Sequence, residues 1–320
     1  MKNNEIVLWF VLMVMAIIPV YAQQYDSEKD FQIDWDPNVK DGVVITKYIG
    51  TKKEINIPPK IQNYPVTGIG NNAFYDKKNI TSVTIPNSVK SIGMWAFHWC
   101  TSLTSVTIPN SVTSIEGSAF YGCTSLTSIT IPNSVKSIGD LAFMSSGLTS
   151  INIPDSVTSM GGGTFSDCKK LARVTIGNGV TSIDSFTIDV FEGAFQYCTS
   201  LTSITIPNSV TRIGGGAFYG CTSLTGITIP NSVTSIGEYA FYKCTSLASI
   251  NIPNRVTSIG DCVFDGCSSL TSVTFQGTIL SKNFSDDNPF PGDLKDKYLA
   301  KDGGPGTYRR LSGGETWRKQ

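Results

Sequence analysis

Residues 108–130 have the sequence IPNSVTSIEGSAFYGCTSLTSIT, and this 23-residue unit decides the fold. Nine copies of it follow one another along most of the chain. Self-similarity at a fixed period of about 20–50 residues is the signature of a solenoid, in which small units stack and each contacts its neighbours. The sequence therefore predicts a one-dimensional stack. The copies start at Ile57, Ile85, Ile108, Ile131, Ile153, Ile176, Ile206, Ile229 and Ile252.

Each unit predicts two short strands and a turn. Residues 103–108 alternate apolar and polar side chains, which is the pattern of a half-buried β-strand. Pro109 cannot donate to a strand ladder, so the strand ends there and the chain turns. Val112 and Ile115 predict a second inward-facing segment, and residues 119–120 predict a return to the core in a turn. The Phe residues at equivalent positions, expected to form a row, are Phe74, Phe97, Phe120, Phe143, Phe165, Phe195, Phe218, Phe241 and Phe264.

Seven of the eight cysteines share one position of the unit. Stacked neighbours would lie about 4.8 Å apart, within reach of a disulfide, but parallel side chains fit its dihedral angle badly. Free cysteine is among the most buried residue types, so we expect a row of reduced, buried thiols, with disulfides as the alternative in a secreted chain. Cys262 stands where other units carry Trp95 or Tyr239, and we expect it to be exposed.

The N-terminus has the pattern of a secretory signal peptide. Lys2 precedes the apolar run 6–20, and Val20-Tyr21-Ala22 gives the small-x-small sequence at which a signal is cleaved. The run of about 15 residues is shorter than the roughly 20 that span a bilayer. We expect residues 1–22 to be a cleaved signal, with an uncleaved anchor as the alternative. We expect the mature chain to have no membrane span and to be secreted or held at the cell surface.

A stack needs caps, because a bare terminal unit exposes its edge. We expect an N-terminal cap at residues 23–56, in which Val43–Thr46 and Glu54–Asn56 form a hairpin around Gly50. The solenoid is expected at residues 57–275.

Residues 276–320 are expected to form a C-terminal cap and a tail of uncertain order. A short helix is expected at Leu294–Ala300, and the tail is a candidate for anchoring or sorting. Two irregularities interrupt the units: a one-residue deletion near Ser146 and a seven-residue insertion at about Ser185–Phe191.

Composition and spacing speak against catalysis and nucleic-acid binding. Acidic and basic residues balance at 25 each, and no basic stripe of the kind that phosphate backbones require is present. The single histidine, His98, occupies a position that varies from unit to unit, as an exposed edge does. The cysteines recur as core positions and not at the spacing of metal ligands. We expect no catalytic residues, no cofactor and no metal.

The unit I-P-x-S-V-T-x-I-G-x-x-A-F-x-x-C-x-S-L resembles the BspA-like class of leucine-rich repeats over about residues 43–275. The resemblance implies a leucine-rich-repeat solenoid with a parallel β-sheet on one face and short strands, turns or helical turns on the other. It also implies a secreted or surface protein of a host-associated microbe. Several members of the class are adhesins that bind host matrix proteins or other microbes, and the class has no shared catalytic residues.

Three surfaces are candidates for binding a protein ligand on host matrix or on another microbe: the hydroxyl-rich strand face, an edge of aromatic side chains, and the insertion. Each has a structural alternative: Thr suits solvent-facing strands, the aromatic rings cover the Phe row, and the insertion forms an extra strand. A structural, self-associating envelope protein is the alternative function, and we expect a monomer or weak self-association. The candidate residues are Trp95, His98, Trp99, Tyr121, Arg173, Phe186, Ile188, Tyr219, Tyr239 and Tyr242.

Overall fold

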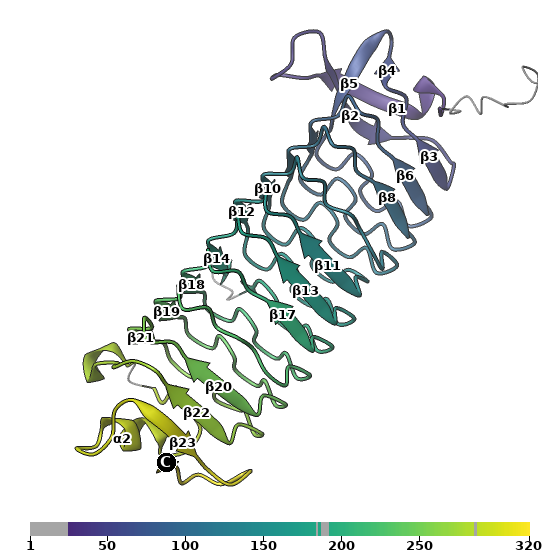
Figure 1. Cartoon of the computed structure of the whole chain (residues 1–320). Coiled ribbons are helices and arrows are strands. Elements are labelled where there is room, and N and C mark those ends of the chain that lie inside the picture. The colour runs from purple at the N-terminus through teal and green to yellow at the C-terminus, as the bar shows by residue number, and fades with distance from the viewer. Residues whose placement is uncertain (1–24, 184, 187–191, 285–286) are drawn as a thin grey trace, which may run out of the picture.

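The computed structural model describes residues 25–183, 185–186, 192–284 and 287–320, and shows an elongated solenoid with a cap at each end (Figure 1). The signal peptide expected at residues 1–22 lies outside the residues that the structure describes. Each copy of the 23-residue unit makes one turn of the coil, so the solenoid expected from the repeat is confirmed. Within the described residues, no helix is both long and apolar enough to cross a membrane.

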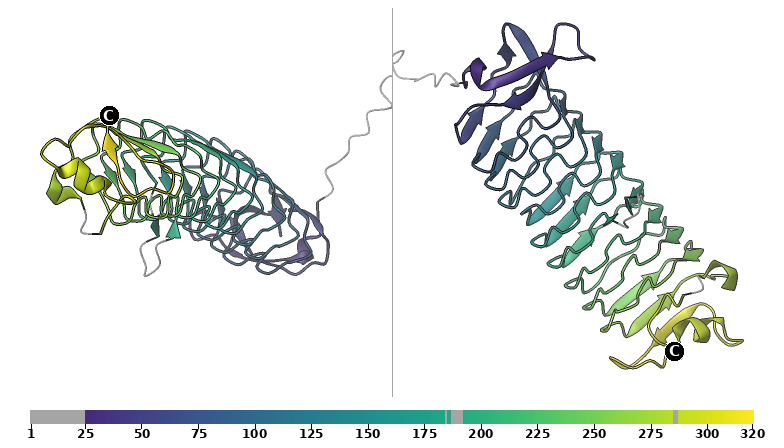
Figure 2. Two further views of the ribbon diagram at one scale, coloured as in Figure 1. Left: turned by 90° about the horizontal axis from the view of Figure 1, so that it is seen from below. Right: turned by 180° about the vertical axis from the view of Figure 1, so that it is seen from behind.

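One side of the solenoid carries the longer strands, which pair in parallel with equivalent residues opposite each other (Figures 1 and 2). In β8 (Ser105–Thr107) the side chain of Val106 is buried while those of Ser105 and Thr107 are exposed, as the alternation predicted. The pairing runs in three stretches, β3-β6-β8, β11-β13-β17 and β20-β22. The other strands of this face are β3 (Glu54–Asn56), β6 (Ser82–Thr84), β11 (Ser150–Ile153), β13 (Arg173–Ile176), β17 (Ser203–Thr205), β20 (Ser249–Ile252) and β22 (Ser272–Phe275).

A second side carries two-residue strands, which are also parallel to their neighbours. Each two-residue strand begins on Ser or Arg and ends on an inward-facing Ile or Met, so that one buried side chain per unit forms a row. This face agrees with the short strands that the repeat implied. Its strands are β5 (Tyr64–Ile69), which is longer, and β7 (Ser91–Ile92), β9 (Ser114–Ile115), β10 (Ser137–Ile138), β12 (Ser159–Met160), β14 (Ser182–Ile183), β18 (Arg212–Ile213), β19 (Ser235–Ile236) and β21 (Ser258–Ile259).

The third side is a stack of turns that holds the Phe row. The N–H of Phe97 donates to the carbonyl of Ala119 in the next unit at 2.8 Å, and the rings of Phe97 and Phe120 stack at 5.1 Å between centroids. All nine Phe residues of the row are fully buried. The caps continue the row, because Tyr48 stacks on the first of these rings at 5.4 Å and Phe290 on the last at 5.2 Å.

The cysteine row is buried, as expected, and its members are free thiols. Each thiol donates to the carbonyl of the Phe in the preceding unit; Cys123 Sγ lies 3.2 Å from the Phe97 oxygen. Burial raises the pKa of Cys100 and Cys267 to about 12. In the fourth unit Ser146 takes the place of the cysteine. Cys262, expected to be exposed, is half-buried.

The prediction that Val43–Thr46 and Glu54–Asn56 form a hairpin is wrong. β2 (Val43–Tyr48) pairs antiparallel with β1 (Phe31–Trp35), while β3 pairs in parallel with β6. Residues 54–57 have the same alternation as the strand of every later unit, with Ile55 buried, so they extend the long-strand ladder instead of folding back. The cap also contains the 3-10 helix η1 (Glu28–Asp30) and β4 (Lys60–Ile61), which is antiparallel to β5.

The C-terminal tail, whose order the sequence left uncertain, forms the body of the cap. β23 (Gly306–Arg309) pairs antiparallel with β22, and β24 (Arg318–Lys319) pairs with β23. Tyr308 and Trp317 are fully buried: the Tyr308 ring contacts Phe275 of the last unit edge-on at 5.8 Å, and the Trp317 ring lies within the cap against Arg310. The helix expected at Leu294–Ala300 is confirmed as α2 (Leu294–Leu299), and the 3-10 helix η2 spans Ser281–Asn283.

The insertion begins and ends in an antiparallel pair, β15 (Ser185–Phe186) with β16 (Glu192–Gly193). Residues 187–191, Ile188 among them, lie outside the described part of the chain. Docking of a partner by the insertion, with Phe186 and Ile188 as its candidate residues, therefore stays a prediction.

The buried thiols predict slow reaction with a thiol reagent. Only the thiolate is nucleophilic, and burial raises the pKa of these thiols, so they stay protonated and covered at neutral pH. In the native protein we expect Cys262 to react first, and the seven row cysteines to react only after denaturation. Titration with a chromogenic disulfide reagent, with and without guanidinium, measures this. Fast native reaction of the row, or no thiols in denaturant, would contradict the arrangement.

Candidate binding surfaces

An aromatic cluster, defined as Tyr75, Trp95, His98, Trp99 and Tyr121, lies on the turn side of the first three units. The His98 ring is stacked between those of Tyr75 and Tyr121, with centroids 5.2 and 4.6 Å away. This spacing follows from the distance of about 4.8 Å between paired strands, because the three residues hold equivalent positions in successive units. The Trp99 ring contacts His98 edge-on at 5.8 Å. The fold thus brings together four candidate residues and adds Tyr75.

The cluster is open to solvent. Trp95 and Trp99 are each 41% exposed and Tyr75 is 48% exposed, and Met94 beside them is 40% exposed. Large apolar side chains are scattered singly on most protein surfaces, whereas gathered ones mark interaction sites. The Phe row beneath is already fully buried with these rings left exposed, so covering the core accounts for only part of their surface.

The two tryptophans have left-handed backbone conformations, with φ of 57° at Trp95 and 58° at Trp99. The turn imposes positive φ at these two positions in most units, and glycine occupies several of them, such as Gly122 and Gly216. A side chain in this region costs roughly 1–2 kcal/mol. Part of the cost is offset, because the Trp99 ring lies over Gly122, where an added Cβ would come within 3.1 Å of it.

His98 was expected at an exposed edge but is half-buried, since rings from the units on both sides cover it. Burial lowers the pKa of His98, against smaller opposing effects of the Ser118 backbone and the Asp76 charge. Its Nδ1 is buried and has no hydrogen-bond partner among the described residues. The lowered pKa keeps the imidazole neutral at physiological pH, and no described residue orients the ring through its buried Nδ1.

A second group of tyrosines lies further along the same side. The Tyr219 ring lies 5.2 Å from Tyr197 and 4.9 Å from Tyr242, and Tyr239 contacts Tyr242 edge-on at 5.6 Å. Tyr197 is 42% exposed. Partial burial, together with the Tyr197 hydroxyl, raises the pKa of Tyr219 to about 12, so the Tyr219 phenol stays neutral. The expected aromatic edge is thus two separate groups.

Arg173 lies elsewhere, on the strand face. It is exposed in β13, opposite Ser150 of β11 and Ser203 of β17. The structure does not bring it together with either aromatic group. It interrupts the row of serines that marks this position in most units.

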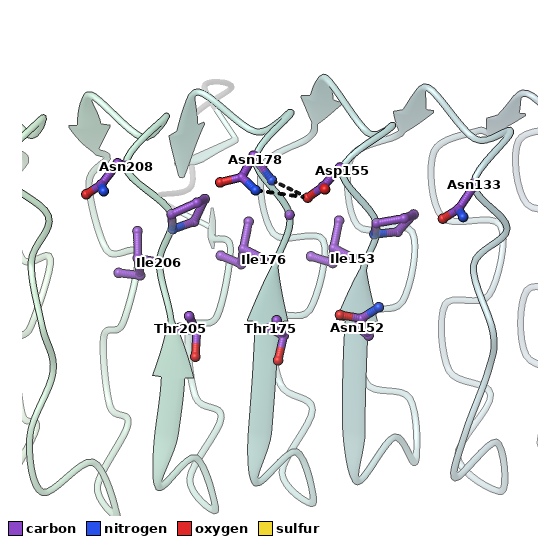
Figure 3. Close-up of a pocket in the computed structure, with 13 residues that line it drawn as sticks. Asn133, Asn152, Ile153, Asp155, Thr175, Ile176, Asn178, Thr205, Ile206 and Asn208 are labelled. Atoms are coloured by element: carbon purple, nitrogen blue, oxygen red, sulfur yellow. Dashed lines mark hydrogen bonds between the residues drawn. The ribbon is translucent and has the colours of Figure 1, made fainter.

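The sequence reasoning missed a hollow at the corner where β11, β13 and β17 end (Figure 3). The polar hollow has a volume of about 530 Å³ and is lined by four successive units. A sequence signal existed: residues 176–180 are I-G-N-G-V, with glycine where most units have Pro and Ser. Its polar side chains are those of Asn133, Asn152, Asp155, Thr175, Asn178, Thr205 and Asn208.

The described residues contain no group of three or more His, Cys, Asp and Glu placed to hold a metal ion.

Taken together, the parallel ladders, the buried Phe row and the exposed turn residues define a repeat protein with a leucine-rich-repeat solenoid. The chain belongs to the BspA type leucine-rich repeat family, whose model matches residues 67–193 and 188–287 with six copies. Proteins built on such repeats usually bind other proteins.

Two solved structures support the fold. A leucine-rich repeat protein of T. pallidum is 31% identical over 63% of this chain and 91% of its own, with a TM-score of 0.57. One from Eubacterium ventriosum is 26% identical over 75% of this chain and 69% of its own, with a TM-score of 0.51. A search of curated proteins gave no match.

The strained tryptophan yields a stability prediction. In Trp99→Gly the loss of ring contacts is offset by release of roughly 1–2 kcal/mol of backbone strain, so the free energy of unfolding should change by less than about 1 kcal/mol. The control Phe97→Ala should lose about 3–5 kcal/mol, because it opens a cavity in the core. Equilibrium denaturation in urea compares the two. If Trp99→Gly lowered the free energy of unfolding as much as the control does, Trp99 would be a residue that stabilises the core.

Proposed function

We propose that this chain is a secreted or cell-surface protein that adheres to host matrix or to another microbe by binding a protein partner. The observation that carries the proposal is the aromatic cluster, with two exposed tryptophans in left-handed backbone. The signal pattern at residues 1–22 supports export, and membership in a leucine-rich repeat family supports binding.

The chemistry of the cluster suits a protein partner. Trp and Tyr supply most of the binding energy in protein interfaces, because they bury a large apolar area around a polar tip. Stacking between successive units fixes the ring of His98 and those of its two tyrosine neighbours, so little side-chain entropy remains to be lost on binding.

The test is binding to immobilised extracellular-matrix proteins and to whole cells of other microbes. The double variant Trp95→Gly/Trp99→Gly should lower the affinity about 30-fold or more. This is the loss expected when two interface anchors together contribute about 2 kcal/mol to the binding free energy. Glycine is used because it accepts the left-handed backbone at both positions.

The matched control is Trp35→Ala, since Trp35 is a 58%-exposed tryptophan in the N-terminal cap, outside the cluster. Equal losses in the control and the double variant would refute the assignment of the cluster. The self-associating envelope protein would be favoured by two results together. The chain would show no saturable binding to any of these surfaces, and its hydrodynamic radius in light scattering would increase with protein concentration.

A further inference from the structure

The polar hollow owes its shape to two glycines. A Cβ added at Gly177 would lie 2.5 Å from the backbone of Pro154 and Asp155, and one at Gly179 would lie 2.3 Å from carbonyl oxygens of the fifth unit. The sixth unit therefore approaches the fifth more closely than a proline or serine would allow. Gly177 has no side chain at the position where the units on either side carry Pro154 and Pro207, and all three residues line the floor of the hollow.

Two rows of exposed polar side chains border this floor (Figure 3). One row comes from the strands and includes Asn152, Thr175 and Thr205, and the other comes from the corner and includes Asp155 and Asn178. Asp155 Oδ1 accepts hydrogen bonds from the backbone N–H of Asn178 at 2.7 Å and from its Nδ2 at 3.3 Å. The bonds fix the Asn178 amide in place before any ligand arrives.

The lining selects against several ligand classes. Asp155 is its one charged side chain and is negative, so a polyanion such as nucleic acid or a sulfated chain is disfavoured. The three isoleucines of the lining, Ile153, Ile176 and Ile206, are at most 9% exposed, so the hollow has no pocket for an apolar peptide side chain. β13 is paired on both sides, by β11 and β17, so no edge is open to an added peptide strand.

We infer that the polar hollow is a binding site for a neutral oligosaccharide, a ligand distinct from the protein partner proposed above. Side-chain amides and hydroxyls both donate and accept hydrogen bonds, and so does every hydroxyl of a sugar. Four successive units line the hollow, and three steps of about 4.8 Å give it a length of about 14 Å, which suits a chain of sugar rings better than a single ring.

The repeat supplies a matched control for the test. Thr175→Ala/Asn178→Ala removes one residue from each row, and Thr228→Ala/Asn231→Ala makes the same change at exposed, equivalent positions two units further along, outside the hollow. The full chain is titrated by calorimetry with short neutral gluco-, manno- and galacto-oligosaccharides, with a sulfated oligosaccharide and a polar peptide as comparison ligands. Circular dichroism of each variant checks that the solenoid is intact.

Saturable binding of at least one neutral oligosaccharide is expected, weakened about tenfold or more by the first double variant and unchanged by the second. No binding of any neutral sugar would overturn the inference, as would equal weakening by both variants or preference for the sulfated sugar or the peptide. The Trp95→Gly/Trp99→Gly variant should bind the sugar normally, so failure of the proposed protein adhesion and failure of this site are separate results.

Discussion

No unit of this protein can bury its own apolar side chains, and the rest of the structure depends on that constraint. A single turn of the coil is one residue layer thick, so the two faces of each Phe ring of the row are covered by the rings of the units above and below. Burial of such a side chain contributes about 1.5–3 kcal/mol, but only when both neighbours are present. The row therefore has to end on rings supplied by the caps, Tyr48 at one end and Phe290 at the other.

The same constraint divides the molecule into positions that vary little and positions that are free to vary. Inward-facing residues are held by two neighbours and repeat from unit to unit. The turn side adds a backbone demand, because two residues per unit take positive φ in most units. Glycine meets that demand at least cost, whereas Trp95 and Trp99 meet it with strain and leave their rings in solvent. Surface function in such a protein accordingly lies in side chains that the stack does not require.

The sequence predicted the solenoid, the buried rows and α2, because periodic burial is a local property that repeats. It failed at both caps. Residues 54–56 were placed in a hairpin by proximity, but their alternation matches the ladder, and β1 provides the antiparallel partner. The tail lacked periodicity, yet its strand β23 pairs with β22 of the last unit and Trp317 is fully buried in the cap. Caps have to fit an edge shaped by the fold, and that fit leaves no period in the sequence.

By itself, the sequence determined the class of fold, the inward rows and the aromatic character of the turn edge, because each depends on which residue recurs every 23 positions. Only the tertiary structure decided that the C-terminal tail pairs with β22 of the last unit, and that the approach of the sixth unit to the fifth leaves a polar hollow. The physical reason is that these features arise between units. They depend on how closely neighbouring turns approach, which residue spacing within one unit does not encode.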